Sequence, residues 1–169
     1  SNFSHMAAGE YERSRESLPC KHPFKRVYQL VASGIGWWRQ GRMRFAENEW
    51  HRALELALSE FGARSITALT AQCVLAQIQY ERGEFDALER AFANRLEFAE
   101  ESVITDSLAG AMTSLAWSRL ARGEPADAEA LLNRLRVQGK ARGWLRMEAV
   151  ATLELLRLDA IDLLMQAER

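Results

Sequence analysis

The sequence predicts an all-α protein: a right-handed α-solenoid of antiparallel helix pairs with a period of about 40 residues. Three observations indicate this class. Apolar residues recur at steps of three and four along most of the chain, the spacing that lays a stripe along one face of a helix. Runs of alternating apolar and polar residues, typical of strands, are scarce. Gly41, Gly83 and Gly123 interrupt the helical pattern 42 and 40 positions apart, within the range of helical repeat proteins.

Residues 1–6 have the composition of an expression-tag remnant, and residues 7–23 are expected to form an N-terminal segment or a short helix. Apolar stripes then predict a first helix pair over 24–40 and 45–61. Gly62 closes this pair, because glycine readily takes the left-handed conformation that ends helices.

The same construction repeats along the rest of the chain. Helices are expected over 66–82 and 85–99, then over 108–120 and from Pro125 to about 135, where proline suits the first turn of a helix. A last stripe begins at Trp144 and resembles the first helix of a further unit. The helical-repeat domain, 24–169, is therefore expected to divide into units of 24–62, 63–103, 104–142 and a partial unit of 143–165.

Aligning the pairs on their turn glycines shows a shared pattern of residue sizes. Seven positions before each glycine stands a small residue, five after it an Ala or Leu, and nine after it a large residue: Gly34, Ala76 and Ala116; Ala46, Leu88 and Ala128; Trp50, Phe92 and Leu132. Small residues let two helices approach closely, and large residues of the facing helix fill the space. The alternative is an ordinary helical bundle, whose hairpins share a glycine turn and an alanine contact without forming a repeat.

The composition fits one folded globular domain. The 169 residues are 48% hydrophobic and 27% charged, with three Pro and ten Gly, which excludes disorder and Pro/Gly-rich fibres. A formal net charge of −1 lacks the basic excess of a nucleic-acid or membrane-surface binder. No apolar run approaches the ~20 residues of a membrane-spanning helix. We therefore expect a cytoplasmic protein with no membrane association and no direct contact to nucleic acid.

Two segments carry a resemblance to known repeat families. Residues 76–85, AQIQYERGEF, resemble the tetratricopeptide repeat, although the period exceeds its usual 34 residues. This segment, together with LAWSRLARGE at 115–124 and GWLR at 143–146, is similar to the superhelical repeat domain of MalT-like transcriptional regulators of the LuxR family. The similarity covers roughly residues 27–164. Three residues depart from the pattern, because a Tyr or a small residue is commoner at their positions: Gln79, Arg119 and Arg95.

The resemblance implies a sensor function. In MalT-like regulators the repeat domain lies between an ATP-binding module and a C-terminal helix-turn-helix, and it receives an inducer or a regulatory protein. This sequence has no phosphate loop of the Gly-x-x-x-x-Gly-Lys-Ser/Thr type, and only five residues follow Leu164. Any ATPase or DNA-binding activity is therefore expected in other domains of a longer parent.

Binding is expected on the first helix of each unit, because solenoids of this type turn these helices toward a concave groove. Six residues on them offer the aromatic faces and fixed polar groups that dominate binding sites: Trp38, Gln77, Tyr80, Thr113, Trp117 and Arg157. Further inward-facing candidates are Val31, Ile35, Cys73, Leu120, Thr152 and Glu154. The alternative for each aromatic residue is that it fills a gap between neighbouring units.

Catalytic and metal chemistry find little support in the sequence. His5, His22 and His51 lack metal-ligand spacing, and Cys20 and Cys73 stand far apart. We expect no metal, no cofactor and no enzyme activity. Two groups of charged residues are expected to form solvated surface instead of a site: Glu97, Glu100, Glu101 and Asp106, and Arg119, Arg122, Arg134, Arg136, Lys140, Arg142 and Arg146.

The sequence therefore predicts a non-catalytic sensor module that binds a small-molecule inducer, or a regulatory protein or peptide, in its groove. The alternative is a constitutive protein–protein adaptor or self-assembly scaffold, in which the same groove holds a peptide or a neighbouring subunit without switching. Self-association into a homo-oligomer is compatible with both.

Overall fold

The structure is a computed structural model, and it describes residues 22–102 and 105–167. Within these ranges the chain forms eight helices and no strand, so the predicted all-α class is confirmed. The expected tag, Cys20 and nearly all of the 7–23 segment lie outside the described residues. No helix within the described ranges combines the length and the apolar character needed to cross a bilayer.

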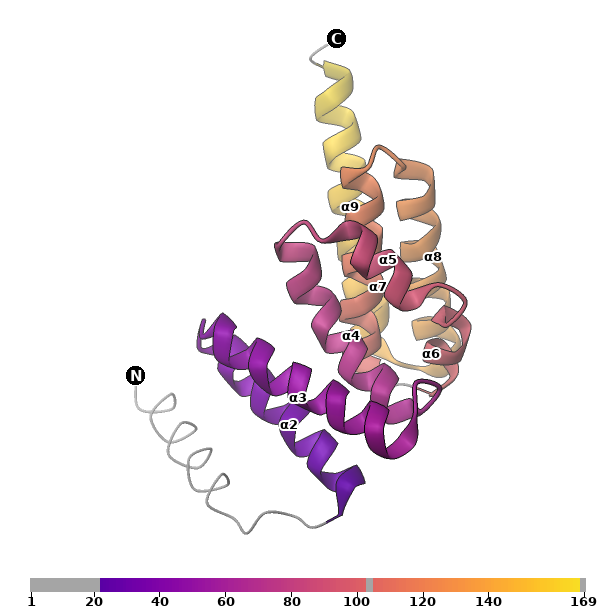
Figure 1. The fold of residues 1–169 in the computed structure, drawn as a ribbon. Helices are drawn as coiled ribbons and strands as arrows, with labels where there is room; N and C mark the ends of the chain where they lie inside the picture. Colours follow the sequence, from indigo (N-terminus) through magenta and orange to yellow (C-terminus); the bar gives the residue numbers. More distant parts are fainter. Residues whose placement is uncertain (1–21, 103–104, 168–169) are drawn as a thin grey trace, which may run out of the picture. The chain divides into compact units, whose positions relative to one another are not determined.

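The helices follow the predicted apolar stripes, and Figure 1 shows their order. The chain divides into two compact units, one ending at Ala71 and one beginning at Gln72, so the boundary falls inside a helix. Each unit is described by itself. The helices are α2 Pro23–Arg39, α3 Met43–Phe61, α4 Ile66–Glu81, α5 Phe85–Phe92, α6 Leu96–Ser102, α7 Thr105–Ala121, α8 Pro125–Arg142 and α9 Leu145–Ala167.

In the first unit, α2 and α3 pack along each other, and Gly34 meets Trp50 at their contact. A Cβ atom at Gly34 would lie 2.0 Å from Nε1 of the Trp50 indole, so the contact needs a residue without a side chain. The indole is fully buried, and its Nε1 donates a hydrogen bond of 3.0 Å to the carbonyl oxygen of Val31. The predicted contact between a small residue and a large one is confirmed for this pair.

One turn geometry recurs after α2, α4, α7 and α8. The turn glycines have positive φ angles of 73°, 70°, 80° and 68°: Gly41, Gly83, Gly123 and Gly143. In each turn, the N–H of the residue after the glycine donates to the carbonyl five residues earlier, as Arg42 does to Trp37 at 2.9 Å. This is the Schellman motif, in which the left-handed residue is usually glycine. The predicted breaks at Gly41, Gly83 and Gly123 are confirmed.

In the second unit, α8 packs against α7 and α9, and α7 also contacts α9. Ala116 of α7 lines the same gap as Ala128 and Leu132 of α8, so the small residue faces the second helix of its pair. The remaining residues of the aligned pattern are also buried: Ala46, Ala76, Leu88 and Phe92.

The single helix expected over 85–99 is wrong. The chain forms α5 and α6 instead, and between them Ala93 has φ −53° and ψ 122° while Asn94 is left-handed with φ 58°. Asparagine visits this conformation more readily than most residues, because its short polar side chain can bond locally. The apolar spacing continues across the break, so periodicity alone does not reveal it.

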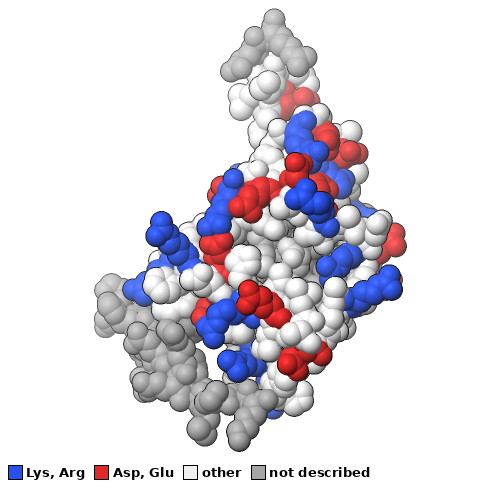
Figure 2. All heavy atoms as spheres, viewed as in Figure 1, with Lys and Arg blue, Asp and Glu red and all other residues white. Residues whose placement is uncertain are grey.

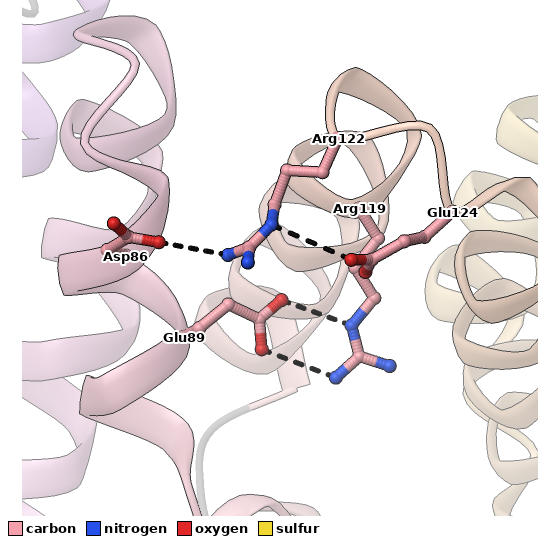
Figure 3. A network of polar contacts seen from close by, with 5 residues as sticks. All are labelled: Asp86, Glu89, Arg119, Arg122 and Glu124. Atoms are coloured by element: carbon pink, nitrogen blue, oxygen red, sulfur yellow. Dashed lines mark hydrogen bonds and ion pairs between the residues drawn. The ribbon is translucent and has the colours of Figure 1, made fainter.

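Ion pairs connect α5 to the end of α7. Figure 3 shows Glu89 opposite Arg119, whose Nε and Nη2 donate to the two carboxylate oxygens at 3.1 and 3.3 Å. Arg122 donates to Asp86 at 3.1 Å and lies 3.7 Å from Glu124. The hydrogen bond to Glu89 raises the pKa of the Arg119 guanidinium. Arg119 is therefore a half-buried connector between two helices and not the solvated charge that was expected.

A buried carboxylate joins α6 to α8. Glu100 was expected on the surface, but its side chain is only 6% exposed, and Nη2 of Arg134 donates to its Oε2 at 2.6 Å. Nη1 of Arg142 donates to the carbonyl oxygen of Glu100 at 2.8 Å. Since α6 has only seven residues, too few for a stable isolated helix, these two arginines help to hold it in place.

Candidate functional site

The second unit contains a cleft of about 290 Å³ between α4, α7 and α9. These are the first helices of the predicted units. One lining residue belongs to α4, four to α7 and three to α9: Gln77; Asp106, Ala109, Gly110 and Thr113; Arg146, Met147 and Val150. We refer to this set as the cleft, and it is the candidate functional site.

Gln77 extends over the backbone of α7 at Gly110. A Cβ atom at Gly110 would lie 2.1 Å from Nε2 and 3.2 Å from Cδ of Gln77. The missing side chain therefore makes room for the amide at the wall of the cleft. Among the described residues, the Gln77 amide has no hydrogen-bond partner. It can both donate and accept a hydrogen bond, so it is available to a ligand.

Thr113 supplies a second polar group without a hydrogen-bond partner among the described residues. Its Oγ1 is buried and has no hydrogen-bond partner within the described part of the chain. By contrast, the hydroxyl of the neighbouring Ser114 donates to the carbonyl oxygen of Gly110 at 2.9 Å. A buried polar group without a partner costs about 1–3 kcal/mol. A ligand that hydrogen-bonds to Thr113 would recover part of this energy.

The mouth of the cleft carries one charge of each sign. Nη1 of Arg146 on α9 donates to Oδ2 of Asp106 on α7 at 2.9 Å, and the two side chains are 70% and 57% exposed. Exposed pairs of this kind contribute about 0–1 kcal/mol, so a ligand can separate them at little cost. Ala109, Met147 and Val150 supply the apolar part of the wall.

A second cluster lies one helical turn further along α7 and α9. Nε1 of Trp117 donates to Oε2 of the buried Glu154 at 2.9 Å. Nη1 of Arg157 donates to both Glu154 oxygens at 3.1 and 3.0 Å, and its guanidinium stands 5.1 Å from the centroid of the Trp117 ring. The structure therefore brings Trp117 and Arg157 together, but their polar groups are already bonded to Glu154.

Two predicted site residues lie elsewhere. Trp38 belongs to the first unit, where its ring centroid is 5.7 Å from that of Trp50. Tyr80 is half-buried, and its ring lies 6.1 Å from Phe85 across the Gly83 turn. Both aromatic rings pack within their own helix pair. The structure does not bring either residue to the cleft.

Some of the further candidates are inaccessible. Val31 and Cys73, expected to face the groove, are buried in the core. Burial raises the pKa of the Cys73 thiol to about 12, so the thiol is neutral at physiological pH. Thr152 is exposed, and its hydroxyl donates to the carbonyl oxygen of Glu148 at 2.8 Å. None of these three residues lines the cleft.

Sequence reasoning identified Gln77 and Thr113 but missed Asp106, Gly110 and Arg146. A signal for the α7 residues was present, because Asp106, Gly110 and Thr113 follow each other at steps of four and three, on one face of a helix. Gly110 is also an interior helical glycine, which costs stability unless a close contact needs it. Arg146 carried no comparable signal.

The surface charge is mixed. Acidic and basic side chains are interspersed on the face that Figure 2 shows. Within the described ranges, no group of three or more His, Cys, Asp and Glu residues could hold a metal ion. The lining of the cleft combines the Gln77 amide and the Thr113 hydroxyl with the Asp106 and Arg146 charges and with apolar side chains. Searches with this chain found no match among protein-family models, curated proteins or solved structures.

Proposed function

We propose that the chain is a non-catalytic binding module that holds a small effector, or a short segment of a regulatory protein, in the cleft. The observation that carries this proposal is the pair of unpartnered polar groups, the Gln77 amide and the Thr113 hydroxyl, beside an apolar wall. Ligand sites in proteins typically combine a mostly apolar lining with a few such groups. A volume of about 290 Å³ suits a small molecule or a few peptide residues.

The proposal includes a sensing step. The cleft is shared by three helices, and the Arg146–Asp106 pair connects α7 to α9 at its mouth. A ligand that binds one spacing of these helices more tightly than another shifts the population toward that spacing. A ligand with equal affinity for both shifts nothing.

The wider context of the proposal is the repeat domain of a MalT-like regulator of the LuxR family, and it rests on the sequence resemblance. The recurring Schellman turns and the buried small residues support a repeated helix-pair architecture, which we propose to be a right-handed solenoid with a period of about 40 residues. In this context, effector binding at the cleft would regulate an ATP-dependent switch and a DNA-binding domain elsewhere in the parent protein.

Ligand binding can be tested by recording amide and methyl NMR spectra of the full chain during titration with a library of small polar molecules and short peptides. We expect binders to shift the signals of Gln77, Gly110 and Thr113. Thr113→Val, which removes the hydroxyl and keeps the shape, should weaken binding about tenfold. Thr152→Val is the matched control, because Thr152 lies outside the cleft. Binders that shift only signals outside the cleft, or affinities unchanged by Thr113→Val, would contradict the proposal.

The competing function is a constitutive adaptor, which would use the same cleft without switching. The two differ in the parent protein. A sensor predicts that a cleft binder changes nucleotide hydrolysis or DNA binding by the parent, and that Thr113→Val weakens this response. An adaptor predicts binding with no change in either activity.

A further inference from the structure

The mouth of the cleft presents a positive and a negative group side by side. Nη1 of Arg146 donates to Oδ2 of Asp106 at 2.9 Å. This bond leaves the second carboxylate oxygen of Asp106 and the other N–H groups of the Arg146 guanidinium without a hydrogen-bond partner among the described residues. Both side chains are more than half exposed. A ligand can therefore contact each member of the pair while the bond between them remains.

The balance of charge at the mouth disfavours ligands that carry a single charge. An anion that contacts Arg146 also comes close to the Asp106 carboxylate, which repels it, and a cation at Asp106 is repelled by Arg146 in the same way. A neutral ligand gains nothing from either charge. A ligand with one charge of each sign meets an opposite charge at both residues, so the mouth favours a zwitterion.

The short distance between the two charges indicates which zwitterion fits. In a free α-amino acid the ammonium and carboxylate groups are bonded to the same carbon, so their polar atoms are about 3 Å apart. In an extended dipeptide the two charges are about 7 Å apart. Because Asp106 and Arg146 are in direct contact, an α-amino acid can place its ammonium group against Asp106 and its carboxylate against Arg146.

The polar groups deeper in the cleft indicate the side chain of the ligand. Gly110 and Thr113 follow Asp106 by four and seven residues, which is about 6 and 10 Å along a helix. A side chain of the length of glutamine extends about 5 Å from its α-carbon. Its end therefore reaches the level of Gly110, where the Gln77 amide lies, with the Thr113 hydroxyl about one turn further.

The end of this side chain is expected to be neutral. The Gln77 amide and the Thr113 hydroxyl carry no charge, so a charged end would have no partner of opposite sign there and would lose hydration. An amide or a hydroxyl can exchange hydrogen bonds with both groups.

The size and the apolar lining of the cleft also fit an amino acid. Ala109, Met147 and Val150 supply apolar wall that can contact the methylene groups of the ligand. The volume of about 290 Å³ lies at the lower end of the range of about 300–1,000 Å³ for ligand sites. The cleft is therefore suited to a ligand as small as a single amino acid.

We propose that the cleft binds a free α-amino acid whose side chain ends in a neutral amide or hydroxyl group, with glutamine as the best-matched example. Its ammonium group contacts Asp106, its carboxylate contacts Arg146, and the end of its side chain contacts Gln77 and Thr113. This inference rests on the proposed function, because it names the ligand class of the same cleft. It adds the requirement that both charges of the ligand contribute to affinity.

An NMR titration of the full chain with L-glutamine at low ionic strength tests this requirement. Three analogues each lack one feature: γ-aminobutyramide lacks the carboxylate, glutaramic acid lacks the ammonium group, and L-leucine lacks the amide. We expect L-glutamine to shift the signals of Gln77, Gly110 and Thr113, and each analogue to bind about fivefold or more weakly.

Two variants assign each charge of the ligand to its partner. In Arg146→Gln, L-glutamine should bind no more tightly than γ-aminobutyramide, because no guanidinium remains to recognise the carboxylate. In Asp106→Asn, L-glutamine should bind no more tightly than glutaramic acid. Arg136→Gln is the matched control, since Arg136 is an exposed arginine of α8 outside the cleft, and it should preserve both differences. Circular dichroism should show unchanged helical content in all three variants.

The inference is overturned if L-glutamine leaves the signals of the cleft unchanged, if the analogues bind as tightly as L-glutamine, or if the differences persist in Arg146→Gln and Asp106→Asn. Its failure can be told apart from failure of the proposed function. If other molecules bind in the cleft while L-glutamine does not, the ligand class alone is wrong. If no molecule of the library binds there, the proposed function is wrong as well.

Discussion

The side chain of Gln77 on α4 lies over the backbone of Gly110 on α7, within 2.1 Å of the position that a Cβ atom at Gly110 would occupy. A glycine inside a helix is less favourable than alanine by about 0.5–1 kcal/mol. The helix therefore gives up some stability at the one position where Gln77 needs room. Gly110 is therefore required by the cleft and is not required by the fold of α7.

Gly110→Ala should leave the fold intact and alter the cleft. The atom nearest to the new methyl group is the end of a flexible side chain, so Gln77 can turn away, and the variant should be as stable as the unmodified chain or up to about 1 kcal/mol more stable. Binding of cleft ligands should weaken, because the amide is displaced. Urea denaturation and NMR titration measure the two effects.

Gly139→Ala is the control for this substitution. A Cβ atom at Gly139 would lie 2.7 Å from the backbone nitrogen of Glu148, and backbone at a helix contact cannot move aside easily. This variant should be less stable. Equal destabilisation by Gly110→Ala and Gly139→Ala would contradict the interpretation of Gly110.

Gly34→Ala should destabilise the first unit. The new methyl group would overlap the indole of Trp50, which is buried and held by its hydrogen bond to Val31, so α2 and α3 must separate. Overpacking of this kind typically costs about 1–3 kcal/mol. Thermal unfolding followed by circular dichroism measures the loss. The double variant Gly34→Ala/Trp50→Leu should lose less than the sum of the single variants, because the smaller side chain accommodates the methyl group.

The register of the paired helices could be predicted from the sequence. The contact between Gly34 and Trp50 could be predicted, because the turn glycine fixes the register of both helices. The break at Asn94 could not, because the apolar pattern continues through it. The burial of Glu100 was also missed, since it depends on where α6 meets α8, and stripes on single helices carry no information about that contact.

Only part of the cleft could be predicted from the sequence. Counting from the turns placed Gln77 and Thr113 on first helices, and both line the cleft. The same counting selected Trp38 and Tyr80, but each ring found an aromatic neighbour within its own helix pair. Residue type and register predict which helix carries a side chain. They do not predict which competing contact the side chain makes.

Cys73 should be unreactive in the folded protein and should make stability depend on alkaline pH. Burial raises the pKa of its thiol from 9.0 to about 12 and outweighs the opposite effect of Arg95. Because the folded pKa is the higher one, the unfolded chain loses this proton between about pH 9 and pH 12 while the folded chain keeps it. The contribution of Cys73 to stability is therefore complete below pH 9 and falls by about 1.4 kcal/mol per pH unit above it.

Two measurements check this prediction. In a Cys20→Ser background, a thiol reagent at pH 8 should modify Cys73 only after denaturant is added. The difference in unfolding free energy between this chain and its Cys73→Ala variant should then shrink as the pH rises from 8.5 to 10.5. Rapid modification of the folded chain, or a difference that does not change with pH, would show that the thiol is accessible.

Arg134→Ala should destabilise the second unit by about 2–3 kcal/mol, because it leaves the buried Glu100 carboxylate without its partner. Arg134 donates to Oε2 of Glu100 at 2.6 Å. Oε1 lies 2.5 Å from Nε of Arg134 and accepts no hydrogen bond from any described residue. The double variant Glu100→Leu/Arg134→Ala should recover much of the loss, since no charge then remains buried. Arg136→Ala is the matched control, because Arg136 is an exposed arginine of the same helix that bonds to Asn133 and to no other described residue. It should change stability by less than about 0.5 kcal/mol. Urea denaturation of the three variants measures these changes in the free energy of unfolding. If the Glu100–Arg134 pair were a surface pair that contributes little to stability, Arg134→Ala and Arg136→Ala would behave alike.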